Sequence, residues 1–165
     1  MRKWIALIAG LLMLALANHA IYRKEQLLSQ GRVVLLELAP VDPRSLMQGD
    51  YMALRYKVAD EVFGRGRLKQ GLHDGRIVLQ LDAQGVGRFL RFDDAAALGV
   101  DEVRMRYRIR GEQVKFASNA FFFQEGQARL YQGARYGEFR VDAQGEALLT
   151  GLRGPDGLVL GLALQ

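Results

Sequence analysis

Four carboxylates near the middle of the chain are the first residues that could do chemistry. Asp42 and Asp50 lie a few positions apart, and the pair Asp60-Glu61 follows them. Two carboxylates held close together can bind a divalent cation, or serve as the acid and the base of a hydrolysis. A carboxylate can also cap a helix or close a turn, because it accepts hydrogen bonds from exposed backbone amides. We favour these structural roles and predict no metal site and no cofactor.

A serine and a lysine offer a second kind of chemistry. Ser45 lies between Asp42 and Asp50, and Lys115 lies in an apolar segment far along the chain. A serine becomes a nucleophile when a lysine with a lowered pKa takes its proton. The alternative function is therefore a membrane-anchored hydrolase that uses the loop from Asp42 to Asp50. The chain has no cysteine and two histidines, which excludes thiol catalysis and disulfides and leaves little for a metal centre. We predict no catalytic residue.

The most concentrated charge in the chain is a row of arginines. Four arginines alternate with four apolar residues in a predicted strand: Arg104, Arg106, Arg108 and Arg110 against Val103, Met105, Tyr107 and Ile109. Alternate side chains of a strand lie on opposite faces, so the arginines share one face. Like charges on one face repel each other unless acidic neighbours or solvent compensate them. The alternative is that this face binds an anionic surface, either lipid headgroups or an acidic partner.

The net charge of +5 is distributed in a way that argues against a nucleic-acid ligand. Arg2, Lys3, Arg23 and Lys24 flank an apolar N-terminal run, and residues 25–165 carry 19 Lys and Arg against 18 Asp and Glu. Nucleic-acid-binding domains need a basic body, or a basic patch with stacking aromatic residues. We predict no nucleic-acid ligand, and the sequence identifies no small-molecule ligand.

The N-terminal run predicts a transmembrane helix. No charged residue occurs from Trp4 to Tyr22, and roughly 20 apolar residues are enough to cross a bilayer as a helix. Helix-forming residues continue to about residue 30, and the flanking charges mildly favour an N-terminus inside the cell. The alternative is a cleaved signal peptide with Ala15-Leu16-Ala17 as its cleavage site. Both interpretations place the rest of the chain outside the cytoplasm.

Beyond Gly31 the dominant hydrophobic period is two, which predicts strands. The predicted strands are 32–39, 51–58, 76–82, 86–92, 103–110, 113–117, 136–142, 146–152 and 158–164. Short helical segments are expected at 94–99 and 124–133. Asp-Ala-Gln-Gly occurs at 82–85 and again at 142–145, each time between two strands, which indicates one shared hairpin turn. The fold class is therefore mainly β, an antiparallel sandwich or partly open barrel with a few helical turns, after the N-terminal transmembrane helix.

The stretch before the second strand combines residues that suit a chain reversal. Asp42 is a good N-cap, Pro43 fits the first position of a helical turn, and Gly49 can end that turn in the left-handed conformation. Asp50 can accept hydrogen bonds from the turn behind it. In the strand that follows, one apolar face carries four residues: Met52, Leu54, Tyr56 and Val58. We expect this face to pack on the core and the whole stretch to be structural.

The same stretch carries a family resemblance. Gly49-Asp50-Tyr51, Leu54 and Tyr56 reproduce the pattern G-D-Y-x-x-L-x-Y, after which the GDYXXLXY family of bacterial membrane-anchored proteins is named. The chain resembles this family also in 40–44, in 121–152 and in its apolar N-terminus. The resemblance implies an N-terminal membrane anchor and a multi-pass membrane protein as partner. It implies no activity.

These features together predict two parts. Residues 1–30 form a membrane anchor helix with its juxtamembrane extension, and residues 31–165 form a β-rich domain outside the cytoplasm. The predicted location is the bacterial plasma (inner) membrane, with a single pass. The predicted function is an interaction or accessory module that works with an integral membrane partner.

Overall fold

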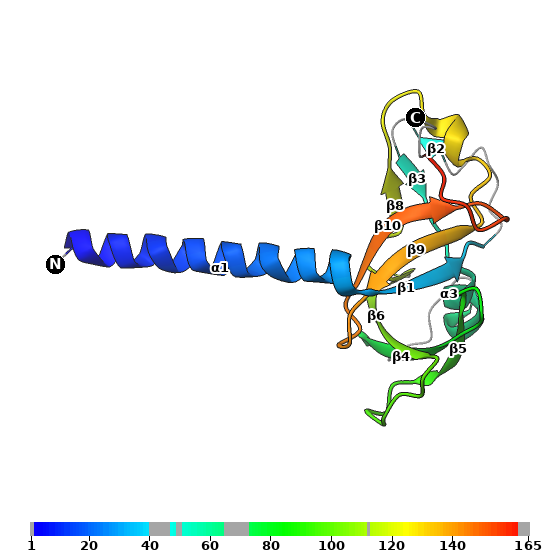
Figure 1. The fold of residues 1–165 in the computed structure, drawn as a ribbon, viewed down its shortest axis with the longest axis horizontal. Helices are drawn as coiled ribbons and strands as arrows, with labels where there is room; N and C mark the ends of the chain where they lie inside the picture. Colours follow the sequence, from blue (N-terminus) through cyan, green and yellow to red (C-terminus); the bar gives the residue numbers. More distant parts are fainter. Residues whose placement is uncertain (1, 40–46, 49–50, 65–72, 112, 162–165) are drawn as a thin grey trace.

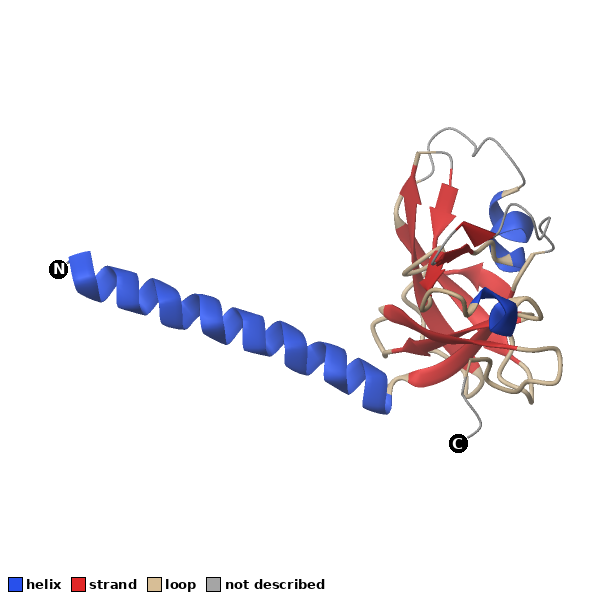
Figure 2. Cartoon of the chain, turned by 90° about the horizontal axis from the view of Figure 1, so that it is seen from above, coloured by secondary structure: helices blue, strands red, loops and turns tan. Residues whose placement is uncertain are grey.

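A long N-terminal helix projects from a β domain in the computed structural model (Figure 1), which describes residues 2–39, 47–48, 51–64, 73–111 and 113–161. The helix is α1 (Arg2–Gln30), and most of its length projects away from the domain in both views (Figures 1 and 2). Among the described residues of the domain there are two short helical segments, α3 (Lys57–Phe63) and the 3₁₀ helix η1 (Ala128–Tyr131).

The described strands form three antiparallel sheets. The first has the order β1 (Arg32–Glu37), β9 (Tyr136–Val141), β10 (Ala147–Arg153). The second has the order β2 (Met47–Gln48), β3 (Tyr51–Ala53), β8 (Ala120–Phe122). The third has the order β5 (Gly87–Phe92), β4 (Gly75–Leu81), β6 (Glu102–Arg110), β7 (Gln113–Lys115). The prediction of a mainly β, antiparallel fold with few helices is confirmed.

The sheets share one apolar core, because each turns its hydrophobic face inward. The largest fully buried side chains come from β1, β4, β6, β9, β10 and the links between strands: Tyr56, Phe116, Phe139, Leu36, Ile77, Leu79, Met105 and Leu152. The Tyr56 ring lies at the centre, edge-on to Phe116 at 6.1 Å and to Phe139 at 5.4 Å between ring centroids. In β6 the predicted alternation holds, since Val103, Met105 and Tyr107 are buried.

The two Asp-Ala-Gln-Gly segments form the same turn. Asp82 accepts hydrogen bonds through Oδ1 from the amides of Gln84 and Val86, at 3.0 and 2.9 Å. In the second copy Asp142 Oδ1 accepts from Gln144 and Glu146, at 3.0 and 2.8 Å. The glycine that ends each turn has a positive φ, +82° and +87°, which favours glycine over residues with a Cβ. These turns join β4 to β5 and β9 to β10.

Four predicted elements differ from the structure. The predicted helical turn before Gly49 is wrong over its described part, where Met47 and Gln48 form strand β2 and pair with β3. In the stretch 51–58, the strand β3 ends at Ala53 and helix α3 begins at Lys57. Its inward face is nevertheless as predicted, with Leu54, Tyr56 and Val58 all buried.

No helical turn forms at 94–99. Ala95 has a φ of +62°, outside the right-handed helical region, and Asp93 and Asp94 each accept a hydrogen bond from the amide two residues on. These local turns replace the predicted cap. The predicted strand 158–164 is also wrong over its described part, where Val159 makes one isolated bridge to Arg153 and the chain turns at Leu160.

Helix α1 joins the domain through its last turn. Leu27 is buried, and the Gly31 amide donates to the Leu27 carbonyl at 3.0 Å. Arg140 of β9 donates to the Gly31 carbonyl at 3.1 Å, which fixes the point where the helix meets the sheet. Over the part of the chain that the structure describes, no helix combines the length and the apolar character that a membrane crossing requires.

Candidate functional site

The acidic residues considered for catalysis divide into two groups. Asp42 and Asp50 lie outside the described residues, as do Pro43, Gly49 and Ser45. Asp60 is held by Arg55, whose Nη2 donates to both carboxylate oxygens at 2.9 and 3.1 Å, and Glu61 lies 3.9 Å from Lys57 Nζ. Among the described residues, no three histidine or acidic side chains gather closely enough to hold a metal ion. Lys115 lies in β7, directly opposite Arg108 of β6.

Acidic neighbours compensate three of the four arginines of β6. Arg104 Nε lies 2.8 Å from Asp93 Oδ2, and Arg110 Nη1 lies 3.1 Å from Asp74 Oδ2. Arg106 pairs with Glu146 through a short hydrogen bond. Arg108 differs from them, because it is exposed and forms no ion pair with any described residue.

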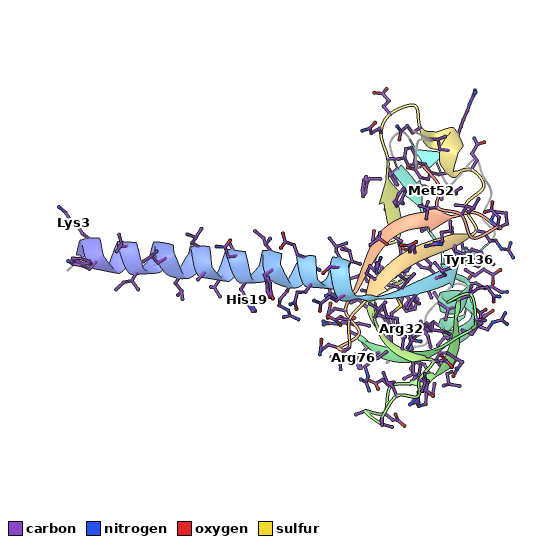
Figure 3. The ribbon with its side chains drawn as sticks, in the orientation of Figure 1. Lys3, His19, Arg32, Met52, Arg76 and Tyr136 are labelled. Atoms are coloured by element: carbon purple, nitrogen blue, oxygen red, sulfur yellow. The ribbon has the colours of Figure 1, made fainter. Side chains whose placement is uncertain are left out.

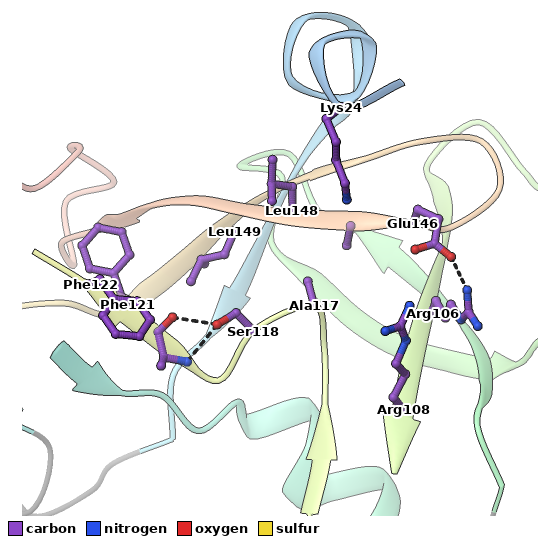
Figure 4. A pocket seen from close by; sticks show the side chains of 12 residues that line it. Lys24, Arg106, Arg108, Ala117, Ser118, Phe121, Phe122, Glu146, Leu148 and Leu149 are labelled. Atoms are coloured by element: carbon purple, nitrogen blue, oxygen red, sulfur yellow. Dashed lines mark hydrogen bonds and ion pairs between the residues drawn. The ribbon is translucent and has the colours of Figure 1, made fainter. Parts of the chain in front are cut away.

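A groove of about 400 Å³ opens beside Arg108 (Figure 4). Its described lining comes from α1, β6, β8, β10 and the link between β7 and β8. The lining residues are Lys24, Arg106, Arg108, Ala117, Ser118, Ala120, Phe121, Phe122, Glu146, Ala147, Leu148 and Leu149. Charged side chains gather at one end of the groove and apolar side chains at the other, so the groove is amphipathic. We call it the basic–apolar groove.

The charge at the basic end is set by Glu146 and the cations around it. The Arg106 amide donates to the Gly145 carbonyl at 2.8 Å, and this contact brings the next residue, Glu146, beside the Arg106 guanidinium. The hydrogen bond from Arg106 lowers the pKa of Glu146, and the charges of Arg106, Arg108 and Lys24 add to the effect. Figure 4 shows the Lys24 side chain reaching from α1 toward this end. The described lining therefore carries three cations against one carboxylate.

Three residues of the motif hold the apolar wall of this groove from behind. The Tyr51 ring lies 5.8 Å from the Phe122 ring, centroid to centroid, and the two residues are paired across β3 and β8. The Leu54 amide donates to the Asn119 carbonyl at 2.7 Å. The Tyr56 hydroxyl donates to the Ser118 carbonyl at 2.9 Å. Tyr51, Leu54 and Tyr56 thus position the segment 118–122, which forms one side of the groove.

Comparison with known proteins bears on the same residues. A family model described as GDYXXLXY protein matches residues 13–152. The chain belongs to the GDYXXLXY family. No curated protein and no solved structure matches it.

The described residues of the GDYXXLXY signature contribute to the core and to one wall of the groove. Leu54 and Tyr56 are buried in the core, and burial raises the pKa of Tyr56 far above its usual range. A phenol buried in this way stays neutral and acts as a hydrogen-bond donor. The GDYXXLXY signature therefore contributes to the groove by holding its wall.

Sequence reasoning missed the groove itself. In the sequence, Lys24 is one of the charges that flank the apolar run, and Glu146 is a residue next to a hairpin turn. Neither position indicates a groove. The run Phe121–Phe123 is the signal that could have pointed to it, because neighbouring residues of a strand cannot all face one core. Phe121 and Phe123 lie against Tyr131 of η1, with centroid distances of 5.1 and 5.3 Å, whereas Phe122 is 73% exposed.

Proposed function

We propose that this chain is a membrane-anchored interaction module. In this proposal α1 anchors the chain in the bacterial plasma membrane, and the β domain lies outside the cytoplasm. The domain binds an integral membrane protein through the basic–apolar groove. The observation that carries the proposal is the exposed apolar surface of α1.

That surface surrounds the helix instead of forming one stripe. Leu11, Leu12, Met13 and Leu14 are 59, 61, 76 and 60% exposed. Successive residues of a helix are rotated by about 100°, so these four cover the whole circumference. Figure 3 shows side chains projecting from every side of α1. A helix that is apolar all round requires an apolar environment. The uncharged run from Trp4 to Tyr22 is close to the roughly 20 residues that suit a bilayer.

The orientation follows from the two ends of this run. Arg2, Lys3 and the amino terminus precede it, while Glu25 offsets part of the charge of Arg23 and Lys24. Positive charge near a membrane helix favours the cytoplasmic side, so the N-terminus is placed inside and the β domain outside. The groove then faces the outer surface of the membrane, because Lys24 contributes to its lining.

Membrane retention tests this function. The full chain should stay in the membrane fraction after alkaline washing, because an embedded helix is not released by loss of charge contacts. Replacing Leu11 and Leu14 together by lysine should release it, since each central charge costs about 2.5–3.5 kcal/mol in a membrane helix. Leu90→Lys, at a 45% exposed position of β5, is the matched control and should be retained. A soluble chain that begins at Asn18 would contradict the anchor and support a cleaved signal peptide.

A further inference from the structure

The basic end of the basic–apolar groove carries more positive than negative charge. Glu146 is already engaged by Arg106, whereas Arg108 and Lys24 form no ion pair with any other described residue. Lys115 lies opposite Arg108 across β6 and β7, and opposed residues of an antiparallel pair place their side chains on one face. This end of the groove therefore attracts anions, and a carboxylate would relieve the repulsion among its cations.

The apolar end exposes hydrophobic surface between two sheets. Phe122 of β8 is 73% exposed, and Leu148 and Leu149 of β10 are half-buried. β8 and β10 are each the last strand of a described sheet. Edge strands present unpaired backbone groups that can pair with an added strand. In β8 the Ala120 amide already donates to Ser118 Oγ and the Ala120 carbonyl accepts from it, so pairing on β8 would begin beyond Ala120. The edges of β8 and β10 therefore suit an extended peptide better than a ligand without backbone amides.

The position of the groove relative to the membrane narrows the choice of ligand, and this step rests on the proposed function. Residues 23–30 separate the end of the uncharged run from the domain, which is a helical length of about 12 Å. Headgroup layers extend roughly 5–8 Å beyond the hydrocarbon on each side. The β domain thus begins above the headgroups of the surrounding lipids, at the level where loops of membrane proteins emerge, while Lys24 at the basic end of the groove lies within the headgroup layer.

Loops on the outer side of membrane proteins have a known bias in composition. Lysine and arginine are in excess in cytoplasmic loops, so outer loops are depleted in positive charge. A segment with acidic and apolar residues matches both ends of the groove.

We propose that the basic–apolar groove binds an extended, acidic and apolar peptide segment from the outer side of an integral membrane protein. Its carboxylates lie at Lys24 and Arg108, and its apolar side chains pack on Phe122 and Leu148. The backbone of the segment pairs with the edge of β8 or β10.

A peptide selection on the full chain, held in neutral detergent, tests this proposal. The probe is a displayed library of random decapeptides, so that the charge of the bound peptides is a result and not an assumption. We expect the selected peptides to combine Asp or Glu with aromatic or aliphatic residues. Their binding should weaken as salt rises, because screening shortens the range of charge attraction to about 10 Å at 0.1 M ionic strength.

Two charge-matched double variants locate the binding. Lys24→Gln with Arg108→Gln should weaken the selected peptides at least tenfold. Arg88→Gln with Arg129→Gln removes the same charge at two exposed positions outside the groove lining and should leave binding unchanged. Phe122→Ser should weaken binding without changing its salt dependence. Because Lys24, Arg108 and Phe122 are all exposed, we expect each variant to fold. The melting temperature of each variant checks this.

Selected peptides without an acidic bias, or equal losses in both double variants, would overturn the proposal. A lipid site would appear as binding of dihexanoyl phosphatidylglycerol that needs Lys24 and Arg108 while no acidic peptides are selected, and this result would also overturn it. The peptide selection is carried out in detergent, so its result depends on the groove and not on insertion of α1 into a membrane. Its failure is therefore distinguishable from failure of the anchor, which the alkaline wash measures.

Discussion

Glu146 shows how a single carboxylate organises the charges of the basic–apolar groove. Its partner Arg106 belongs to β6, which lies in a different sheet from the hairpin that carries Glu146. The pair therefore joins two sheets as well as compensating an arginine. The pKa of Glu146 is lowered mainly by the hydrogen bond from Arg106. The folded state therefore stabilises the charged form of Glu146 more than the unfolded chain does.

This shift predicts a dependence of stability on pH. A carboxylate whose pKa is lower in the folded state stabilises the protein above its unfolded pKa of about 4.3, and that stabilisation is lost as the pH falls through the folded value. Glu146→Gln should therefore melt roughly 1–4 °C below the wild type at pH 7, a range typical of partly exposed pairs. The difference should shrink as the pH falls through the lowered pKa of Glu146, because the protonated Glu146 and the glutamine that replaces it are both uncharged.

Thermal melting between pH 7 and pH 2 measures this effect. Glu125→Gln is the matched control, because Glu125 is exposed and forms no ion pair with a described residue. A difference between wild type and Glu146→Gln that persists unchanged at pH 2 would show that packing, and not charge, explains it.

At the scale of elements, the link between β3 and α3 supports the wall of the groove formed by 118–122. The Tyr56 hydroxyl contributes the bond to the Ser118 carbonyl, while its ring packs between Phe116 and Phe139. Tyr56→Phe keeps the ring and removes the bond, leaving a part-buried carbonyl unpaired. We expect a loss of about 1 kcal/mol in the free energy of unfolding and weaker peptide binding in the groove, measured by urea unfolding and by titration.

Tyr136→Phe is the control for this variant, because the Tyr136 hydroxyl has no hydrogen-bond partner among the described residues. It should change neither quantity. If Tyr56→Phe lost stability but bound the selected peptides normally, the wall would not depend on this bond, and the signature would act only through the core.

Sequence reasoning predicted elements whose pattern is local. The alternation of β6 is readable because its neighbours in sequence already define its two faces, and the repeated Asp-Ala-Gln-Gly turns carry their own hydrogen bonds. Helix α3 was missed because Tyr56 and Val58 extend the period-two pattern of the preceding strand. Helix α3 is only two turns long, so its helical spacing shows only in Val58 and Val62, which are four residues apart.

The groove was beyond sequence reasoning for a different reason. Its charged end joins Lys24, Arg108 and Glu146, which are far apart along the chain. They lie in α1, in β6 and in the turn before β10. Their proximity depends on how the sheets pack and on the docking of α1 through Leu27. The arginine row was visible, but which of its members lacked an acidic partner depended on the positions of Asp74, Asp93 and Glu146 in the fold.

At the scale of the whole molecule, the proposed function assigns anchoring to α1 and binding to the β domain. The helix carries apolar side chains on every side along its outer length (Figure 3), and its last turn is fixed to β9 through Arg140 and Gly31. In the proposed arrangement, a domain fixed to its anchor in this way would keep one face toward the membrane. The basic–apolar groove, with Lys24 in its lining, would belong to that face.

The central claim is that the β domain lies outside the cytoplasm on a membrane anchor, and single-cysteine labelling tests it most directly. The chain has no cysteine of its own. Val100→Cys places a thiol at an 89% exposed position of the domain, and Lys3→Cys places one before the apolar run. Both full-length variants are treated with a membrane-impermeant maleimide in intact spheroplasts. We predict that Val100→Cys is labelled at once and Lys3→Cys only after lysis, with both chains in the membrane fraction. Labelling of Val100→Cys only after lysis would contradict the account.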